Sequence, residues 1–493
     1  MIGTLVPLVG DWIASPKWLD SGDTAWQLTA ATLVGLMSIP GLAVLYGGVV
    51  QRKFAINSVM MAFYAFSMVL MVWVLWGFNM SFGKPWHGVS STGFLGNMIG
   101  IPAPALDHLA EQAQAGIPEL ANAPGPSFAF PQSALVYFQF VFAAITPLLF
   151  LGSVIGRMSF KAWMLMVPLW STFIYSVNAF LLWGGGWWAA QGAVDYSGGY
   201  VIHLAAGTSG FVAAAVIGPR LNKDRSMNSP NNLLMVMAGA GLLWMGWNGF
   251  NGGDPYFANA DAASAVLNTN IAAATAMLTW MFIDVFAAGK PSLTGSVNGM
   301  ITGLVAITPA AGFVNGTGAI AIGVAAAAIP WFTMNKVAIF RKVDDALGVV
   351  HTHGIAGLIG GLMVGLVADP KMLEYVGTKG SADISIGGWF LNGHDWHQFN
   401  LQAGAALTII VFDAIGTFVI LKLIGLVVPL RMSVAELEAG DEVLHGEEAH
   451  APVYVPAPAP VLPGLAVPRG APALAGVGHS AEISAPLSGT AGS

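Results

Sequence analysis

The sequence contains no cysteine and little charge. The absence of thiols excludes disulfide bonds, thiolate catalysis and cysteine metal sites. Only 9% of the 493 residues are Asp, Glu, Lys or Arg, whereas an ordinary soluble domain has about 25%. The net charge of −7 gives no sign of a basic surface for nucleic acid. So few charges cannot cover a water-exposed globular surface, and 55% of the residues are hydrophobic.

What the sequence does contain is a series of long apolar runs. A run of about 20 residues crosses a hydrocarbon layer of ~30 Å as a helix. Strand-length alternation of apolar and polar residues is absent, which disfavours a transmembrane β-barrel. We therefore predict an all-α polytopic membrane protein with eleven transmembrane helices. The predicted spans are residues 26–50, 56–83, 134–155, 161–183, 197–218, 231–251, 261–288, 293–312, 316–335, 347–368 and 401–428.

The basic residues are distributed unevenly between the linkers. The linkers after odd-numbered spans hold eleven Lys and Arg residues, and those after even-numbered spans hold three. Because Lys and Arg accumulate on the cytoplasmic side of a membrane, we predict that the N-terminus is outside and the C-terminus is inside the cell.

This topology predicts a simple domain plan. A membrane domain carries two inverted repeats and a final helix, followed by an acidic segment and then by an Ala/Pro-rich tail whose composition is typical of disorder. The predicted parts are an external N-terminal tail (1–25), the membrane domain (26–428, with repeats 26–218 and 231–368 and a final helix 401–428), a cytoplasmic acidic regulatory segment (429–450) and a disordered tail (451–493).

The repeat is most visible in two short stretches. Residues 195–210 read DYSGGYVIHLAAGTSG, and residues 345–360 read DALGVVHTHGIAGLIG. In each, a His follows an Asp by eight residues, so His203 and His353 are 150 positions apart. The two stretches belong to spans that enter from opposite sides, which is typical of a five-plus-five inverted repeat.

The spacing also predicts the depth of the two histidines. Eight helical residues rise about 12 Å at 1.5 Å each, close to half of a ~30 Å hydrocarbon core. An ionisable side chain at that depth is costly and indicates a functional site, so we predict that His203 and His353 meet near the midplane. The alternative is two independent histidines, each satisfied by a hydroxyl or carbonyl of another helix. His351 is expected on nearly the opposite helix face and is assigned no role.

Aromatic residues collect at the predicted outer ends of three spans. Phe142, Trp183 and Phe250 belong to this group, and Asp254 follows Phe250 by four residues. Aromatic faces beside a carboxylate can bind a small cation. Two simpler readings stay open: an interfacial aromatic belt, and a turn-forming Asp254 before Pro255.

Several long stretches resemble the ammonium transporter family (Amt/Mep/Rh) over residues 20–450. They read IPGLAVLYGGVVQRK, GKPSLTGSVNGMITGLVAITPAAGFV, DDALGVVHTHGIAGLIGG and LHGEEAH. The motif around Trp183 and the DYSGG stretch favour the bacterial-type Amt branch over the Rhesus branch. The resemblance implies transport of ammonium or ammonia without enzyme activity or cofactor, by a homotrimer in the cell membrane with one pore in each subunit. It also suggests a PII-type regulatory partner at the cytoplasmic face, and leaves open whether methylammonium is carried.

The resemblance also implies roles for single residues. Trp183 and Phe142 would form the external ammonium site, Phe142 and Phe250 a gate, and His203 and His353 the lining of a hydrophobic pore. Asp195 would be a structural or recruiting carboxylate near the outer mouth. Asp254 stands where the family often has Ser, so it would add a negative charge to the ammonium site.

Two other functions remain to be weighed against transport. One is an ammonium sensor, which would bind the same ligand but needs a separate signalling partner. The other is a membrane oxidoreductase with His203 and His353 as axial haem ligands, which predicts a visible absorption band. Asp284 and Asp413, inside predicted spans, are expected to form interhelical hydrogen bonds, and a role in proton relay stays open.

Overall fold

The computed structural model describes residues 16–86, 94–107, 111–120, 123–226, 230–375 and 383–449. Within these residues the chain is mostly helical, and its strands form only three two-stranded antiparallel sheets. Residues 1–15 of the predicted external tail and all of the predicted disordered tail, 451–493, lie outside the described residues.

Long helices broken by short 3-10 or π-helical segments (η) make up the first half. These elements are α1 (Ser21–Leu36), η1 (Met37–Leu42), α2 (Ala43–Val49), η2 (Arg52–Phe54), α3 (Ala55–Val72), η3 (Trp73–Gly77), α4 (Phe78–Phe82), η4 (Phe94–Asn97), α6 (Gln132–Val154), α7 (Phe160–Trp170), η5 (Ser171–Tyr175), α8 (Ser176–Leu182), α9 (Trp187–Gln191), η6 (Gly199–Leu204) and α10 (Ala205–Ile217).

The second half has the same character and ends in two short helices. Its elements are α11 (Asn222–Ser226), α12 (Leu233–Gly252), α13 (Ala260–Ala288), α14 (Leu293–Ile307), α15 (Gly316–Lys336), η7 (Phe340–Lys342), η8 (Val350–Ile355), α16 (Ala356–Val367), α17 (His397–Gly425), α18 (Val434–Ala439) and α19 (Asp441–His445).

The strands lie in the connections between helices. Each pairs with one antiparallel partner, β1 with β4, β2 with β3 and β5 with β6. Their bounds are β1 (Gln114–Gly116), β2 (Glu119–Leu120), β3 (Ala123–Pro124), β4 (Ser127–Pro131), β5 (Leu373–Tyr375) and β6 (Asp383–Ser385).

The predicted membrane helices are present as long apolar helices. Ten helical stretches among the described residues are long and apolar enough to cross a bilayer. The chain is therefore an α-helical polytopic membrane protein. The eighth predicted span corresponds to α14, an apolar helix of 15 residues that is shorter than a full crossing. The count of eleven transmembrane helices stays a prediction.

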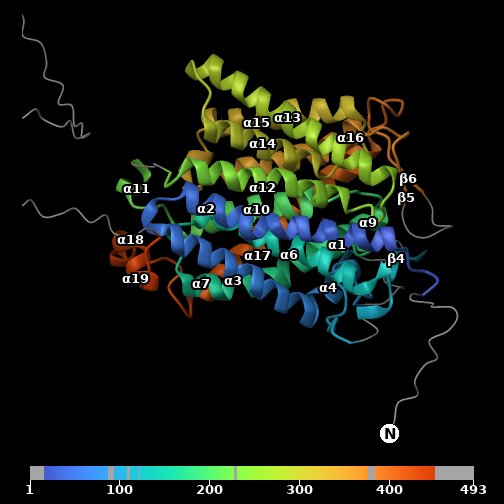
Figure 1. Ribbon diagram of the computed structural model, residues 1–493, viewed down its shortest axis with the longest axis horizontal. Helices are drawn as coiled ribbons and strands as arrows, with labels where there is room; N and C mark the ends of the chain where they lie inside the picture. Colours follow the sequence, from blue (N-terminus) through green and yellow to red (C-terminus); the bar gives the residue numbers. More distant parts are fainter. Residues whose placement is uncertain are drawn as a thin grey trace, which may run out of the picture. The chain divides into compact units, whose positions relative to one another are not determined.

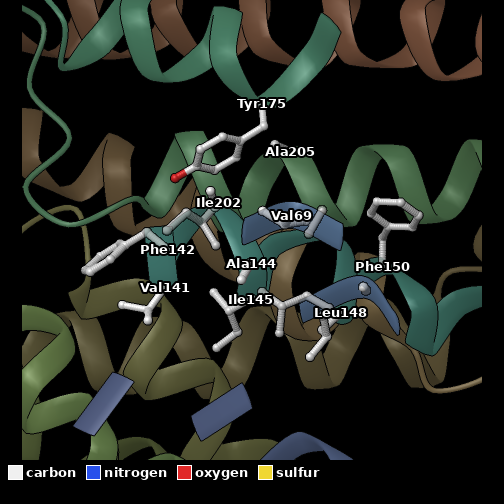
Figure 2. Packing of buried hydrophobic residues seen from close by; sticks show 14 of the residues in the cluster. Val69, Val141, Phe142, Ala144, Ile145, Leu148, Phe150, Tyr175, Ile202 and Ala205 are labelled. Atoms are coloured by element: carbon white, nitrogen blue, oxygen red, sulfur yellow. The ribbon is translucent and has the colours of Figure 1, made fainter. Parts of the chain in front are cut away.

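Helix α6 lies at the centre of the helical packing. In the 18-residue apolar stretch of α6, 94% of the stretch is buried inside the protein. The corresponding share for α13 is 22%. Helices α1, α3 and α10 all pack against α6. Figure 2 shows part of this core, including Phe142, Ile145 and Leu148 of α6 and Ile202 of η6. Because α6 is enclosed on all sides, residues along it can line a path through the protein without contacting lipid.

The two ends of the helical bundle differ in chemistry. We call one end the basic face: it carries α11, α18 and α19 (Figure 1), and there Arg157 and Arg220 both bond to Asp344. We call the other end the hairpin face, because it carries the small sheets; there the N–H of Asp20, just before α1, donates to Ala129 of β4. The Arg220 guanidinium pairs with Asp344 at 2.8 Å, and although burial alone would raise the pKa of Asp344, these bonds lower it to about 2.

The acidic segment after α17 packs against the same chain. The Asp441 carboxylate accepts hydrogen bonds from the backbone N–H groups of Ile56 and Asn57 at 2.8 and 2.9 Å. The Lys53 ammonium donates to the carbonyl of Leu437 at 2.7 Å. These contacts place α18 and α19 against the start of α3, where the Asp441 carboxylate satisfies N–H groups that have no partner inside the helix.

Candidate functional site

Both repeat stretches begin as a short π-helical segment followed by an α-helix. The first is η6 with α10, and the second is η8 with α16. In each copy the preceding Asp accepts backbone N–H groups at the helix start. Asp195 Oδ2 accepts from Tyr200 and Val201 at 2.9 Å each, and Asp345 Oδ2 accepts from Val350 at 2.8 Å. The repeated Asp is thus a cap for the helix that carries the His.

The two stretches enter the bundle from opposite ends. The backbone carbonyl of Asp195 accepts a hydrogen bond from Trp183 Nε1 at the carboxyl end of α8. By contrast, Ala346, which follows Asp345, bonds to Ser153 near the end of α6, next to the loop of Arg157 on the basic face. The antiparallel arrangement expected from the repeat is therefore present in this pair of segments.

His203 and His353 meet in the interior. Their Nδ1 atoms are 3.2 Å apart, and their rings lie nearly parallel with centroids 5.3 Å apart. The exposed fractions are 0% and 8%. Since one Nδ1 must donate to the other, the two rings are opposite tautomers when both are neutral. Among the described residues neither imidazole forms an ion pair.

Two glycines, Gly207 and Gly354, allow the helices that carry His203 and His353 to approach closely. A Cβ atom on Gly207 would lie 2.3 Å from the Cα of Gly354, far inside van der Waals contact. The helices therefore touch backbone to backbone one turn beyond His203 and directly after His353. This is the close approach that the small residues of the repeat predict.

Aromatic rings connect the hairpin face to the histidines. Phe142 contacts Trp183 edge-on at 6.3 Å between centroids and Phe250 at 4.3 Å. Phe250 in turn stacks with His203 at 5.9 Å. Both phenylalanines are 0% exposed, so their rings close the path in this conformation.

Ser197 and Trp247 support this row of stacked rings, which we call the ring file. The Ser197 hydroxyl donates to the carbonyl of Phe250 at 2.9 Å, which holds α12 beside the first repeat stretch. Trp247 stacks on His203 at 5.3 Å, with its Nε1 donating to Thr308. Neither contact has a sequence signal, because each depends on which separate helices pack together in the fold.

Two buried carboxylates lie at the hairpin-face end of this file. Burial raises the pKa of Asp195 to about 6, although its backbone N–H partners lower it. Burial also raises the pKa of Asp254 well above its ordinary value, against the lowering effect of the Ser197 hydroxyl, and the nearby Asp195 adds to the increase. Asp254 Oδ2 is buried with no hydrogen-bond partner among the described residues. A negative charge at Asp254 is therefore costly until a cation or donor arrives.

A cavity of about 520 Å³ extends from the histidines to the basic face. Its lining includes His353 and Trp247 at one end and Phe340 and Arg341 at the other. His351 diverges from His353 as its spacing predicts, because it contacts Thr333 of α15 instead of His203. It nevertheless lines the same cavity, whose wall includes His351, Thr352 and His353 of η8.

The two other intramembrane aspartates form interhelical hydrogen bonds, as expected. Asn178 of α8 donates to both carboxylate oxygens of Asp413 in α17, at 2.9 and 3.0 Å. Trp331 of α15 donates to Asp284 of α13 at 2.8 Å. Both contacts cross-link helices.

The fold and these contacts define the class of protein. An α-helical membrane protein with an enclosed aromatic file, a buried histidine pair and a cavity toward one face is built as a pore or transporter for a small solute. The model of the Ammonium Transporter Family matches residues 25–450. The chain belongs to the ammonium transporter family.

Individual relatives agree with this assignment. The chain is 49% identical over 464 residues to Ammonium transporter 3 member 2 of Oryza sativa subsp. japonica, covering 91% of this chain and 94% of the relative. It is 49% identical over 444 residues to Ammonium transporter 2 of Arabidopsis thaliana, covering 88% and 89%. The crystal structure of Saccharomyces cerevisiae Mep2 superimposes with a TM-score of 0.71 and 29% identity, covering 85% and 89%. The two plant relatives are transporters by name, which agrees with the expectation of a transporter and not an enzyme.

Proposed function

We propose that this protein moves ammonium nitrogen across the cell membrane as ammonia. Ammonium binds at the hairpin face between Trp183, Phe142 and Asp254, where it loses its proton. Ammonia then passes the Phe142 and Phe250 rings, follows His203 and His353, and enters the cavity toward the basic face.

The observation that carries the proposal is the buried path itself. Between Trp183 and His353 the file consists of aromatic and imidazole rings in contact, and neither imidazole has a charged partner among the described residues. An isolated cation stripped of water there would cost tens of kcal/mol by Born estimates. Ammonia is neutral and small, so leaving the proton behind removes most of this barrier. Potassium cannot lose its charge in this way.

The histidine pair suits a neutral solute that both donates and accepts hydrogen bonds. With opposite tautomers, one ring presents a free acceptor nitrogen and the other a free N–H. The buried Nε2 of His203 has no partner among the described residues. A passing ammonia molecule can therefore replace part of its lost hydration at this point.

The proposal includes orientation and assembly. We assign the hairpin face to the outside and the basic face to the cytoplasm, since most of the Lys and Arg residues of the linkers fall on the basic side. This places the start of α1 outside and α18 and α19 in the cytoplasm. By resemblance to the family, we further propose a homotrimer, with the segment of α18 and α19 as the docking region for a PII-type protein.

The test uses the purified protein in liposomes on a solid-supported membrane. Ammonium pulses should produce currents or an internal pH change that empty liposomes lack, and equal potassium pulses should not. The His353→Ala variant should lose this selectivity, with methylammonium run beside ammonium as a second substrate. Failure to move ammonium, or equal permeation of potassium, contradicts the proposal. A stable ammonium complex without flux would favour a sensor instead.

A further inference from the structure

His351 has a bonding arrangement that the pathway above does not use. Its side chain is 6% exposed and lines the cavity that leads from His353 to the basic face. Its Nδ1 lies 2.9 Å from the hydroxyl oxygen of Thr333 in α15. That hydroxyl donates its one hydrogen to the carbonyl of Pro330 at 3.0 Å.

These two bonds together favour one tautomer of His351. Because the Thr333 hydrogen is given to Pro330, the Thr333 oxygen acts as acceptor, and Nδ1 of His351 is the donor. A neutral imidazole that donates through Nδ1 has an unshared electron pair on Nε2. Among the described residues no hydrogen-bond partner reaches that Nε2, and it is not sealed within the core. An oriented acceptor is thus presented at the cavity wall.

The other groups around the cavity leave this acceptor free. Asp345 is engaged by the N–H of Val350, Tyr46 donates to the carbonyl of Leu148, and the Arg341 guanidinium donates to Asn335. These three and His353 are the other titratable or charged side chains of the lining. The ring of Phe340 packs edge-to-face against His351 at 4.9 Å and fixes its plane. His351 is therefore held rigidly by α15 on one side and by Phe340 on the other.

We propose that His351 forms a second ammonium-binding site, on the cytoplasmic side of the histidine pair. Ammonia takes a proton from water in the cavity, which leaves hydroxide to diffuse out at the basic face. The ammonium formed donates an N–H to Nε2 of His351, and so do small primary ammonium ions. The site sets the half-saturating ammonium concentration for entry from the basic face. It is distinct from the ammonium site at the hairpin face. This inference rests on the proposed direction of the pathway.

Two substitutions separate the acceptor from the structural role of the ring. In His351→Asn, the short amide can keep the donor to Thr333 but has no group at the position of Nε2. In His351→Gln, the longer amide can present an oxygen near that position. Two vesicle preparations of the full-length protein are needed, one with the hairpin face outside and one with the basic face outside. They allow the half-saturating ammonium concentration to be measured separately at each face.

The expected result is a change in the ratio of the two half-saturating concentrations, basic face over hairpin face. His351→Asn should raise this ratio about tenfold, the effect of losing one hydrogen bond to a charged ligand, and His351→Gln should restore most of it. A merely structural role would lower activity from both faces together and leave the ratio unchanged. An unchanged ratio in His351→Asn, or an equal change in both variants, overturns the inference.

A binding measurement keeps this test independent of flux. In ¹⁵N-histidine-labelled protein, ammonium chloride should shift the Nε2 resonance that disappears in His351→Asn, whereas potassium chloride should not. A shift in a protein that shows no flux would refute the proposed transport and support the site. Flux with no shift at any ammonium concentration would refute the site and support transport.

Discussion

At the scale of single residues, the hairpin face holds acidic side chains that are buried and only partly bonded. Glu374 of β5 is 4% exposed, and its Oε1 packs close to Gly312 and Tyr196 without a hydrogen-bond donor among the described residues. Burial raises the pKa of Glu374 from 4.5 to about 9, and the nearby carboxylates of Asp261 and Asp254 act in the same direction. The side chain is therefore a neutral acid at physiological pH.

This predicts a pH dependence of stability that Glu374→Gln removes. Between pH 4.5 and about pH 9, Glu374 holds a proton in the native state that it has lost in the unfolded state. The free energy of unfolding therefore falls as the pH rises through this window. The glutamine variant lacks this slope. In thermal unfolding in detergent, the melting temperature of the variant relative to that of the wild type should rise by at least about 2 °C from pH 5 to pH 9. Parallel curves would mean that Glu374 is ionised throughout.

Asp254 gives a second prediction at this scale. In the proposed ammonium site this buried carboxylate gains a partner on binding, so Asp254→Asn should raise the half-saturating ammonium concentration at the hairpin face about tenfold, the value of one charge-assisted hydrogen bond. The wild-type advantage should grow with pH, because burial raises the pKa of Asp254 and a higher pH favours its charged form. The exposed Asp395→Asn on the same face is the control. If the two variants behave alike, Asp254 is only a turn residue.

At the scale of elements, the crossing of the two repeat helices determines whether the histidines can meet. Gly207→Ala would place a methyl group 2.3 Å from the backbone of Gly354, and forcing the helices apart should cost about 1–3 kcal/mol. Loss of ammonium flux should accompany the lower melting temperature. The matched control is Gly241→Ala in α12, where nothing lies within 4 Å and helix propensity should add about 0.5–1 kcal/mol of stability. Equal behaviour of the two variants would rule out a tight crossing.

The elements also show which contacts can be predicted from the sequence and which cannot. The spacing of Asp195 and His203, repeated 150 residues later, predicted both the antiparallel entry and the meeting of the rings, because helical rise and membrane thickness are fixed quantities. Aromatic clustering at the predicted outer ends singled out Trp183, Phe142 and Phe250, and the family resemblance supplied their roles. The sequence did not predict the Ser197 bond to Phe250 or the Thr333 bond to His351. Those contacts depend on which distant helices face one another, and no periodicity records that.

At the scale of the whole molecule, the acidic segment acts as a separate part docked on the membrane helices. Asp441→Asn removes the charge that accepts the two N–H groups at the start of α3 and should weaken docking by about 1–2 kcal/mol. Hydrogen exchange in α18 and α19 should rise about tenfold, with little change in the membrane helices. Glu438→Gln is the control, since its ion pair with Lys223 is about half exposed on both sides and contributes little. Equal exchange in both variants would show that Asp441 does not hold the segment.

The aspartate caps of the two broken helices bear on the direction of flow. A helix start carries a partial positive charge of roughly half a unit, and Asp195 and Asp345 each set a carboxylate against one such start, at opposite mouths. The partial positive charge of each helix start is thus offset by a carboxylate at both entrances. The two caps therefore add no preferred direction of their own, and any bias must come from other groups at the two ends, such as binding sites outside the ring file.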